Sequence, residues 1–366
     1  MARALQLARC GLNTTHPNPR VGCVLAREGK IVGEGWHEFA GKPHAERNAL
    51  AQAGDLARSA TAYVTLEPCC HFGRTDPCVT ALIKAGIRRV VGAITDPNPQ
   101  VSGQGFAELS RAGVVVETGL LASEAAKLNS GFIMRMKHGR PFVRCKLAMS
   151  LDGRTAMSSG ESQWITGSAA RRDVQRLRAQ SSVILTGLGT VVADDPSLTL
   201  RPEEFGIITG KKPIRQPLRV VLDPQLAISP QAIILQPAIA PITVIACSGQ
   251  HSRDRAKLFR KRGITVAELP GDGSNIHLAS LMDYLATEEI NEVLLESGAR
   301  LAGAMLRQGL LDELIIYLAP TIMGSSARAL FDLPEIRRMA HRYRLEITDM
   351  RAVGEDWRIT ARFVRK

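Results

Sequence analysis

A regular alternation of strand-like and helical segments constrains the fold of this chain more than any other feature. In order, the first part reads as a hairpin over 21–26 and 30–37, a helix over 44–54, a strand over 61–67, a helix over 77–86, a strand over 87–94, a helix over 105–113, a strand over 114–119 and a helix over 123–139. Strands separated by helices pack as a parallel sheet with helices on its faces. We therefore predict an α/β domain whose sheet is largely parallel beyond the hairpin.

The segment KHGRP at 137–141 interrupts this alternation, and we place a domain boundary there, between residues 1–140 and 141–366. Beyond it, helices are expected near 168–180, 252–262, 276–287 and 299–309, between strands at 182–187, 218–223, 242–247, 264–269 and 292–297. The last segments, 312–320, 344–354 and 356–364, read as antiparallel strands, and 202–217 reads as a surface loop. The sequence thus predicts two α/β domains in succession.

The charge of the chain points to an anionic partner. Its formal net charge is +12, but aromatic residues make up only 4% of it, too few for stacking on single-stranded nucleic acid. Composition therefore favours phosphorylated small molecules over nucleic acid. The sequence contains neither an apolar run of membrane-spanning length nor a signal-peptide pattern, so we expect no membrane partner and a cytoplasmic location. Seven cysteines in that setting favour metal or thiol chemistry over disulfides.

A metal-binding pattern is spread over residues 44–78. His44 and Glu46 form an H-x-E motif at an expected helix start, Cys69 follows a proline at a strand end, and Cys78 follows a proline at the next helix start. H-x-E followed by P-C-x-x-C is the signature of zinc-dependent deaminases. Here eight residues separate the cysteines instead of two, so the pattern requires an additional loop.

The residue types explain the chemistry that such a site performs. Three protein ligands, His44, Cys69 and Cys78, leave a fourth zinc position for water, whose pKa the metal lowers toward ~7. Glu46 is placed to take a proton from that water and to pass it to a leaving amine. His44 and Cys78 both lie at expected helix N-termini, where the partial positive charge favours thiolate and hydroxide.

Several alternatives remain open at this stage. A closed structural zinc site would use four of Cys69, Cys70, His71, Cys78 and His44, but side chains of adjacent cysteines diverge, and Glu46 would have no role. Within the inserted loop, His71, Arg74 and Thr75 suggest a phosphate clamp; the alternative is that Arg74 is simply solvated. The side chain of Asn18, with one donor and one acceptor, can hydrogen-bond the edge of a pyrimidine ring. Alternatively, Asn18 is only the first residue of an Asn-Pro turn.

Three segments resemble a known family. "HPNPRVGCV" (16–24), "PHAERNAL" (43–50) and "YVTLEPCCHFGRTDPC" (63–78) are similar to the deaminase half of the bifunctional bacterial riboflavin-biosynthesis deaminase/reductase. Segments of the second part, such as "KLAMSLDGRTAMSSGESQWITG" (146–167), "GTVVADDPSLTLR" (189–201) and "LESGARLAGAMLRQGLLDEL" (295–314), resemble its reductase half. The resemblance therefore covers nearly the whole chain. It also implies a shortened start, because the family usually carries a few residues before the segment beginning at Met1.

The resemblance implies a fold and an activity. The expected architecture is an N-terminal cytidine-deaminase-like three-layer α/β/α domain and a C-terminal dihydrofolate-reductase-like α/β domain. The first would hydrolyse the 2-amino group of 2,5-diamino-6-ribosylamino-4(3H)-pyrimidinone 5′-phosphate with one zinc ion. The second would reduce the ribosyl side chain to ribityl with NADPH, giving 5-amino-6-ribitylamino-uracil 5′-phosphate.

The reductase half offers weaker patterns than the deaminase half. No complete G-x-G-x-x-G motif is present, although Gly187 and Gly189 supply part of one. Gly298, between a strand and a helix, lets a helix N-terminus approach a phosphate. Arg178, Arg201 and Ser162 are candidates to bind the substrate phosphate, and from pattern alone Arg178 reads better as a surface charge. Lys146 and Asp152 are further candidates for substrate contact.

The resemblance implies the following contacts. Cofactor contacts are Ala148, Trp164, Thr190, Asp194, Gly298, Ala299, Arg300, Leu301, Ala302, Gly303 and Ala304. Substrate contacts are Asn18, His71, Arg74, Ser162, Arg178, Leu198, Arg201 and Glu296.

Two other classes of function compete with this one. The first is a tRNA or DNA base deaminase with a C-terminal binding module. The basic charge of the chain agrees with it, but the stretched cysteine spacing and the small number of aromatic residues do not. A structural-zinc interaction protein would suit the cysteines alone. We also expect a homodimer or a higher homo-oligomer, because most soluble oligomers are symmetric.

Overall fold

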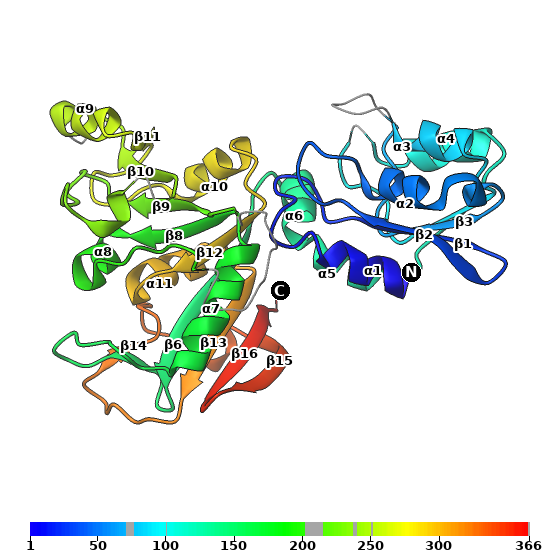
Figure 1. The fold of residues 1–366 in the computed structure, drawn as a ribbon. Helices are drawn as coiled ribbons and strands as arrows, with labels where there is room; N and C mark the ends of the chain where they lie inside the picture. The colour runs from blue at the N-terminus through cyan, green and yellow to red at the C-terminus, as the bar shows by residue number, and fades with distance from the viewer. Residues whose placement is uncertain (71–76, 100, 202–214, 237–239, 250–251, 365–366) are drawn as a thin grey trace. The chain divides into compact units, whose positions relative to one another are not determined.

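The computed structural model describes residues 1–70, 77–99, 101–201, 215–236, 240–249 and 252–364. The chain divides into two compact units, Met1–Arg140 and Pro141–Lys366. Each unit has its own sheet (Figure 1). Each also has its own hydrophobic core.

The first unit is built on a five-stranded sheet of order β2-β1-β3-β4-β5. Its strands are β1 Gly22–Arg27, β2 Lys30–Trp36, β3 Thr61–Val64, β4 Arg89–Gly92 and β5 Val115–Thr118. Glu28 and Gly29 adopt positive φ angles between β1 and β2, as the tight hairpin turn requires. β1 pairs with β3 antiparallel, whereas β3, β4 and β5 are parallel. The predicted hairpin and the largely parallel sheet beyond it are confirmed.

Helices cover both faces of this sheet. They are α1 Ala2–Arg9, α2 Ala45–Ala53, η1 Gly54–Ala57, α3 Cys78–Lys84, α4 Gln104–Arg111, α5 Ala122–Leu128 and α6 Ser130–His138. α2, α3 and α4 share one core with the sheet, while α1 and α5 pack on separate clusters that include Val24 and Ala93. The three-layer α/β/α arrangement is therefore present.

The prediction of one continuous helix over 123–139 was wrong, because the segment breaks at Asn129. Its backbone lies at φ −116° and ψ 26°, between α5 and α6. The Asn129 side chain is buried and hydrogen-bonds both backbone groups of Arg20, at 2.8 and 2.9 Å. Asparagine competes for backbone hydrogen bonds in this way, and a tertiary contact of this kind is not visible in helical periodicity.

Two glycines allow α2 to lie directly on the sheet. A side chain at Gly33 would meet the carbonyl oxygen of Ala49 at 2.3 Å, and one at Gly35 would meet that of Ala45 at 2.4 Å. The helix presents Ala45, Ala49 and Ala53 to the sheet, all buried. This close packing fixes the start of α2, where the H-x-E motif lies.

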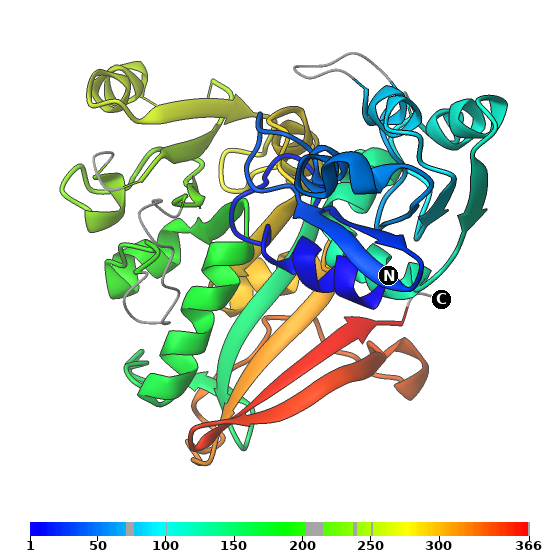
Figure 2. The same ribbon diagram turned by 45° about the vertical axis from the view of Figure 1, so that its right-hand side comes forward.

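The second unit contains a nine-stranded sheet of order β11-β10-β9-β8-β12-β6-β13-β16-β15, and a two-stranded sheet of β14 and β7 (Figure 2). The strands are β6 Phe142–Ser150, β7 Arg154–Ala156, β8 Val183–Gly187, β9 Leu218–Leu222, β10 Ile242–Cys247, β11 Thr265–Leu269, β12 Glu292–Glu296, β13 Glu313–Ala319, β14 Arg328–Ala329, β15 Leu345–Val353 and β16 Asp356–Phe363. The helices are α7 Ser168–Gln180, α8 Leu188–Asp194, η3 Ile233–Leu235, α9 Arg253–Lys261, α10 Leu278–Thr287, α11 Ala299–Arg307 and η4 Met339–His341.

The last three strands of this unit are antiparallel to one another, as predicted: β13 pairs antiparallel with β16, and β16 with β15. On its other side β13 pairs parallel with β6, a neighbour that its own periodicity does not reveal. After Gly187, the residues Leu188–Asp194 form the helix α8.

Candidate active sites

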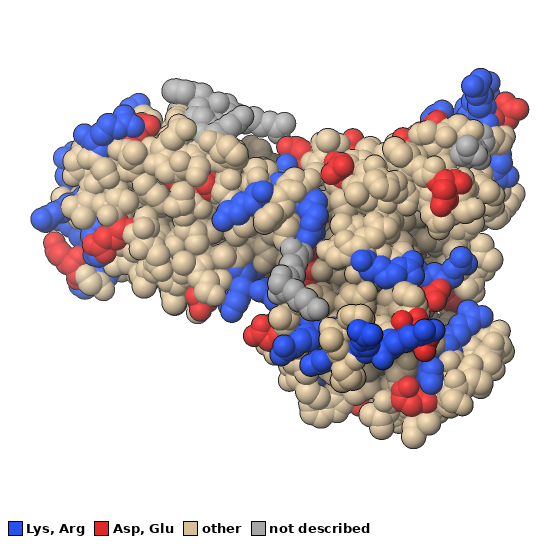
Figure 3. Space-filling view, turned by 180° about the vertical axis from the view of Figure 1, so that it is seen from behind, with Lys and Arg blue, Asp and Glu red and all other residues tan. Residues whose placement is uncertain are grey.

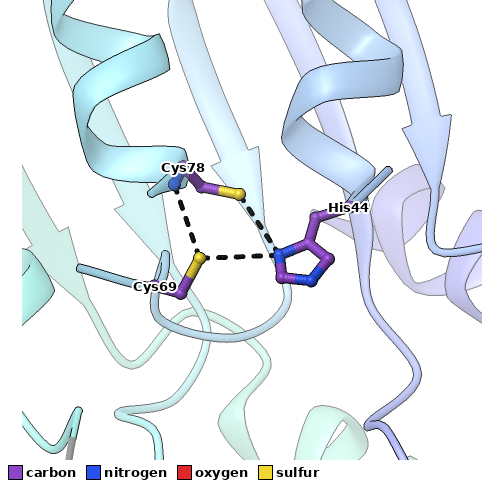
Figure 4. A group of neighbouring side chains, drawn as sticks. All are labelled: His44, Cys69 and Cys78. Atoms are coloured by element: carbon purple, nitrogen blue, oxygen red, sulfur yellow. Dashed lines mark hydrogen bonds between the residues drawn. The ribbon is translucent and has the colours of Figure 1, made fainter. Parts of the chain in front are cut away.

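Three side chains of the first unit converge on one point (Figure 4). The Nδ1 atom of His44 lies 3.5 Å from the Sγ of Cys69 and 3.4 Å from the Sγ of Cys78. His44 caps α2, Cys78 opens α3, and Cys69 lies in the loop after β3. Hydrogen bonding to the side chains of Cys78 and His44 lowers the pKa of the Cys69 thiol, and a thiolate is the form that binds a metal.

The loop that carries Cys69 is held by a buried carboxylate two residues earlier. Glu67 accepts hydrogen bonds from the backbone N–H groups of Asp96, Gly103, Gly105 and Phe106, at 2.8 to 3.2 Å. These bonds tie the end of β3 to the start of α4. Glu67 therefore has a structural role, and it positions Cys69 without touching the metal cluster.

Glu46 lies in the first turn of α2 and is buried. Burial, reinforced by the nearby Cys69, raises the pKa of its carboxyl group to about 7. Its Oε2 atom has no hydrogen-bond partner among the described residues. A buried polar atom without a partner is costly in a folded protein, so this oxygen is suited to a ligand or water.

His37 was not singled out by sequence reasoning, yet it lies beside the cluster. Its ring meets that of His44 edge to face, with 5.2 Å between centroids. Nδ1 lies 3.2 Å from the carbonyl oxygen of Pro43, and Nε2 lies 3.1 Å from the Nδ2 of Asn18. Burial lowers the pKa of His37, so the neutral ring accepts a hydrogen bond from the Asn18 amide. A lone histidine after a strand gives no pattern that would have identified it.

The inserted loop follows Cys69 and ends at Cys78. His71, Arg74 and Thr75, predicted to clamp a phosphate, lie outside the described residues. Cys70 is partly buried and packs against the hydrophobic core, away from the cluster formed by His44, Cys69 and Cys78. All seven cysteines are free thiols.

Replacing Cys69 or Cys78 with serine should weaken zinc binding by more than ~100-fold, because even groups outside a coordination shell change metal affinity by about 10–100-fold. Cys70→Ser is the matched control, one residue away, and should keep its zinc. Metal content after dialysis, measured by atomic absorption, distinguishes the variants. Loss of zinc from the Cys70 variant would instead indicate the closed structural site.

In the second unit, two strand-to-helix joints lie side by side. β12 pairs parallel with β8, and β8 ends at Gly187 before α8, while β12 ends at Glu296 before Gly298 and α11. A Cβ atom at Gly189 or Gly298 would meet nothing within 4 Å. Ligands of α/β sheets bind at the carboxyl ends of parallel strands, so this open edge suits a nucleotide.

A buried ion-pair network lies at the same edge. The guanidinium of Arg178 donates to both carboxylate oxygens of Glu296, at 2.7 and 3.0 Å, and Lys146 lies 3.7 Å from one of them. Burial alone would raise the pKa of Glu296, but Arg178 and Lys146 outweigh it and lower that pKa to about 2. Arg178 is therefore not the solvated surface charge that its pattern suggested.

The remaining predicted residues are distributed around this edge. Ser162 donates a hydrogen bond of 3.4 Å to Asp194, so these two residues lie together. Trp164 is 70% exposed and stacks against the guanidinium of Arg171. Ala148 lies partly buried on β6, Thr190 is partly buried in α8, and Leu198 is buried.

Not all of the predicted residues face open space. Arg201 is exposed, and its backbone N–H donates to Gln175. Within α11, Ala302 belongs to the core, and a side chain at Gly303 would meet the Asp332 carbonyl oxygen at 2.1 Å. The first turn of α11, with Ala299, Arg300 and Leu301, is less enclosed, and Ala304 is partly buried.

Arg219, on β9, is a second residue that sequence reasoning missed. It is fully buried, and its guanidinium donates to the carbonyl oxygens of Ser197, Gln236 and Ala240. Arg178 holds the same loop through the Thr199 carbonyl oxygen, at 3.0 Å. Two guanidiniums thus fix the loop that carries Leu198, which adopts a positive φ of 48°.

Figure 3 shows how charged side chains are distributed over one face of the chain. On the face in Figure 3, lysine and arginine side chains lie in small groups with acidic residues between them. No helix in the described part of the chain is long and apolar enough to span a membrane.

Known proteins match both units. Residues 1–94 match the family described as the cytidine and deoxycytidylate deaminase zinc-binding region, and residues 141–359 match the RibD C-terminal domain. The riboflavin biosynthesis protein RibD of Escherichia coli K12 is 49% identical over 361 residues, covering 97% of this chain and 96% of that protein. The chain belongs to the RibD family. It is a bifunctional enzyme of riboflavin biosynthesis, with a zinc-binding deaminase domain and an NADPH-dependent reductase domain.

Solved structures of the RibD family confirm the predicted fold class. Acinetobacter baumannii RibD, form 1, superposes with a TM-score of 0.90 at 44% identity, covering 100% of this chain and 98% of that one. A diaminohydroxyphosphoribosylaminopyrimidine deaminase/5-amino-6-(5-phosphoribosylamino)uracil reductase from Thermotoga maritima gives 0.85 at 32% identity, with 100% and 97% coverage. These likenesses favour the deaminase/reductase over the nucleic-acid base deaminase that competed with it.

Proposed function

We propose that the first unit hydrolyses the 2-amino group of 2,5-diamino-6-ribosylamino-4(3H)-pyrimidinone 5′-phosphate, and that the second reduces the ribosyl group of the product to ribityl. The name of the Thermotoga maritima relative, which describes a deaminase and a reductase acting on such compounds, supports this substrate. The single observation that carries the proposal is the buried Oε2 of Glu46, which lies beside the three-donor cluster and has no hydrogen-bond partner among the described residues.

The donor set of the first unit fits zinc. One imidazole nitrogen and two thiols lie within 4.8 Å of one another, and among the described residues no fourth donor joins them. When bound there by His44, Cys69 and Cys78, zinc supplies an acidified water molecule. Three ligands with an open position are typical of catalytic rather than structural zinc sites.

Glu46 then carries the proton of the hydrolysis. Its carboxylate accepts a proton from the attacking water as the oxygen bonds to the ring carbon that bears the amino group. It delivers that proton to the neighbouring ring nitrogen. It then takes the proton of the new hydroxyl group and passes it to the amino nitrogen as the carbon–nitrogen bond breaks, so that ammonia leaves and a ring carbonyl remains. Glu46 ends in its starting state.

Asn18 and His37 provide the recognition of the ring. Because His37 accepts from the Asn18 amide nitrogen, the carbonyl oxygen of Asn18 is oriented away from that ring and accepts from a pyrimidine N–H. His71 and Arg74 complete the proposal as donors to the 5′-phosphate, since a cation beside an imidazole suits that group.

The residues of the second unit hold the reductant and the sugar. NADPH supplies the hydride when it is bound. Gly298 and the first turn of α11 approach its phosphates, and Trp164, Thr190, Asp194 and Ala148 line its remaining contacts. Glu296, oriented by Arg178, accepts from substrate hydroxyls, while Ser162, Leu198 and Arg201 lie toward the substrate phosphate.

Changing Gly298 to aspartate should raise the KM for NADPH by at least ~10-fold, because a carboxylate at this helix N-terminus repels the cofactor phosphates. Gly298→Ala is the matched control, since both changes add a Cβ atom into open space at an ordinary φ of −74°. Steady-state NADPH oxidation measures the difference. Equal KM values for the two variants would place the phosphates elsewhere.

A coupled assay tests the whole proposal. Purified protein with the diaminopyrimidinone ribotide should release ammonia without any reductant, and should then oxidise NADPH in equal amount. Ammonia without NADPH oxidation would overturn the account of the second unit. No ammonia from a zinc-loaded sample would overturn that of the first.

The proposal also includes a cytoplasmic enzyme that acts as a homodimer or a higher homo-oligomer. Seven free thiols and a phosphorylated substrate suit a reducing compartment where phosphorylated metabolites are retained.

A further inference from the structure

A short segment of the second unit, 197–201, is held by side chains rather than by backbone pairing. It lies shortly after α8 and belongs to no helix or strand. Gln216 bonds to both backbone groups of Leu200, at 2.8 Å each, as a neighbouring strand would. The other side chains that bond to backbone groups of the segment are Gln175 to Arg201, Arg178 to Thr199 and Arg219 to Ser197, at 3.0 to 3.2 Å. The conformation of the segment is therefore imposed by its surroundings.

Leu198 is the exception within this segment. Neither of its backbone groups forms a hydrogen bond to another described residue. Its φ of 48° lies in the left-handed region, which leucine rarely adopts, and its side chain is buried. Backbone strain of this kind is concentrated at sites that hold ligands. The N–H group of Leu198 is therefore suited to a ligand.

Arg219 binds the carbonyl group that precedes Leu198. It is fully buried, and its guanidinium also donates to the carbonyl oxygens of Gln236 and Ala240, at 2.9 and 2.5 Å. No carboxylate among the described residues pairs with it. Burial lowers its pKa to about 10, so the guanidinium is still charged at neutral pH. A buried charge without a counter-ion is unfavourable, and a bound anion would compensate it.

Arg178 holds the segment on the other side of Leu198, but its charge is already compensated. Its guanidinium pairs with both carboxylate oxygens of Glu296, while its third nitrogen donates to the carbonyl oxygen of Thr199. The two arginines thus fix the backbone on either side of Leu198 and differ in the charge that they leave there. The uncompensated positive charge belongs to Arg219.

A single peptide unit links Arg219 to the N–H of Leu198. The carbonyl group of Ser197 and the N–H of Leu198 belong to the same unit, which is trans, so the two groups point in opposite directions. A guanidinium that binds the carbonyl oxygen therefore directs the N–H to the opposite side. It also polarises the unit, so that the N–H becomes a stronger donor.

We propose that Arg219 is a positioning residue, which acts through this peptide unit to make the reductase selective for a 5′-phosphorylated sugar. The inference rests on the proposed function, in which Leu198 lies toward the substrate phosphate. The Leu198 N–H donates to a phosphate oxygen, and the uncompensated charge of Arg219 favours the anion. A sugar without the phosphate gains neither interaction, whereas an arginine with only a structural role would affect both sugars equally.

The test compares two substrates of the second unit: the deaminated ribotide, and the same compound after a phosphatase has removed its 5′-phosphate. NADPH oxidation gives kcat and KM for each. Arg219→Gln should lower the ratio of the two kcat/KM values by roughly 10–100-fold, because hydrogen bonds to charged groups contribute about that factor. The loss should be a higher KM for the ribotide, with kcat/KM for the dephosphorylated compound near its wild-type value.

Arg219→Lys separates charge from shape, and it keeps the proposal testable if Arg219→Gln does not fold. It should retain more of the ratio than Arg219→Gln while the introduced amine is protonated. Because burial lowers the pKa of an amine, the ratio should fall below that of wild type as the pH rises over roughly 6–9. An Arg219→Lys enzyme with the wild-type ratio at every pH would overturn the proposal.

Arg255→Gln is the matched control. The Arg255 guanidinium donates to the carbonyl oxygens of Leu226 and Ile228, at 2.6 Å each, and so holds a different loop of the same unit. This variant should keep the wild-type ratio. A wild-type enzyme that oxidises NADPH with neither compound would show that the proposed function itself is wrong. If wild type reduces the ribotide, then an unchanged ratio in Arg219→Gln, or no preference for the ribotide in wild type, would overturn this inference alone.

Discussion

Glu46→Gln should reduce ammonia release by about 10³-fold, within the range that general acid–base groups contribute. Glutamine has the same shape but can neither take a proton from water nor return one to the leaving amine. Zinc binding should persist, because Glu46 is not among the three converging donors. NADPH oxidation with the deaminated ribotide should also persist, since that reaction belongs to the second unit.

The matched control for this variant is Glu28→Gln, which removes an exposed carboxylate at the hairpin turn of the same unit. It should retain wild-type ammonia release. Metal analysis and both rate measurements are made on the same preparations. An active Glu46→Gln enzyme would exclude Glu46 as the proton carrier, and loss of zinc from that variant would show that Glu46 supports the metal instead.

Arg178→Met should lower the free energy of unfolding by about 3 kcal/mol, because breaking a buried ion pair leaves an uncompensated charge. Glu296 is 7% exposed, and Lys146 at 3.7 Å compensates it only in part. Adding Glu296→Gln removes the buried charge and should recover much of the loss. Chemical denaturation of the single and double variants measures both effects.

Arg89→Met provides the control, because Arg89 forms an equally close bidentate pair with Glu117, but on the surface. It should leave the unfolding free energy nearly unchanged. The pH dependence has a defined sign. The lowered pKa of Glu296 stabilises the fold above the ordinary glutamate value, and this stabilisation is lost as the pH falls toward about 2. The free energy of unfolding of wild type should therefore approach that of the Arg178→Met/Glu296→Gln variant as the pH falls. A difference between the two that stays constant from the ordinary glutamate pKa down to about pH 2 would contradict this account.

Local sequence patterns predicted most of the fold because the elements that they describe are short and strongly periodic. Gly54 ends α2 with a positive φ, and the Glu28–Gly29 turn closes its hairpin, as their residue types require. The break at Asn129 and the parallel pairing of β13 depend on distant partners, Arg20 and β6. No window of sequence contains those partners, so periodicity could not reveal them.

The same distinction separates the site residues. His44, Cys69 and Cys78 are close in sequence to recognisable element ends, and the structure brings their donor atoms together. His37 and Arg219 matter through contacts with Asn18, Ser197 and Ala240, none of which is marked by a motif. Arg178 looked like a solvated charge because its partner, Glu296, lies 118 residues away.

The four backbone bonds that Glu67 accepts have a consequence for how the enzyme responds to metal supply. They hold the end of β3 against the start of α4 with protein groups alone, so the scaffold of the cluster does not depend on zinc. We therefore expect the chain to stay folded when its metal is lost and to become active again when the metal returns. A shortage of zinc would then stop the deamination reversibly, without unfolding or loss of the protein.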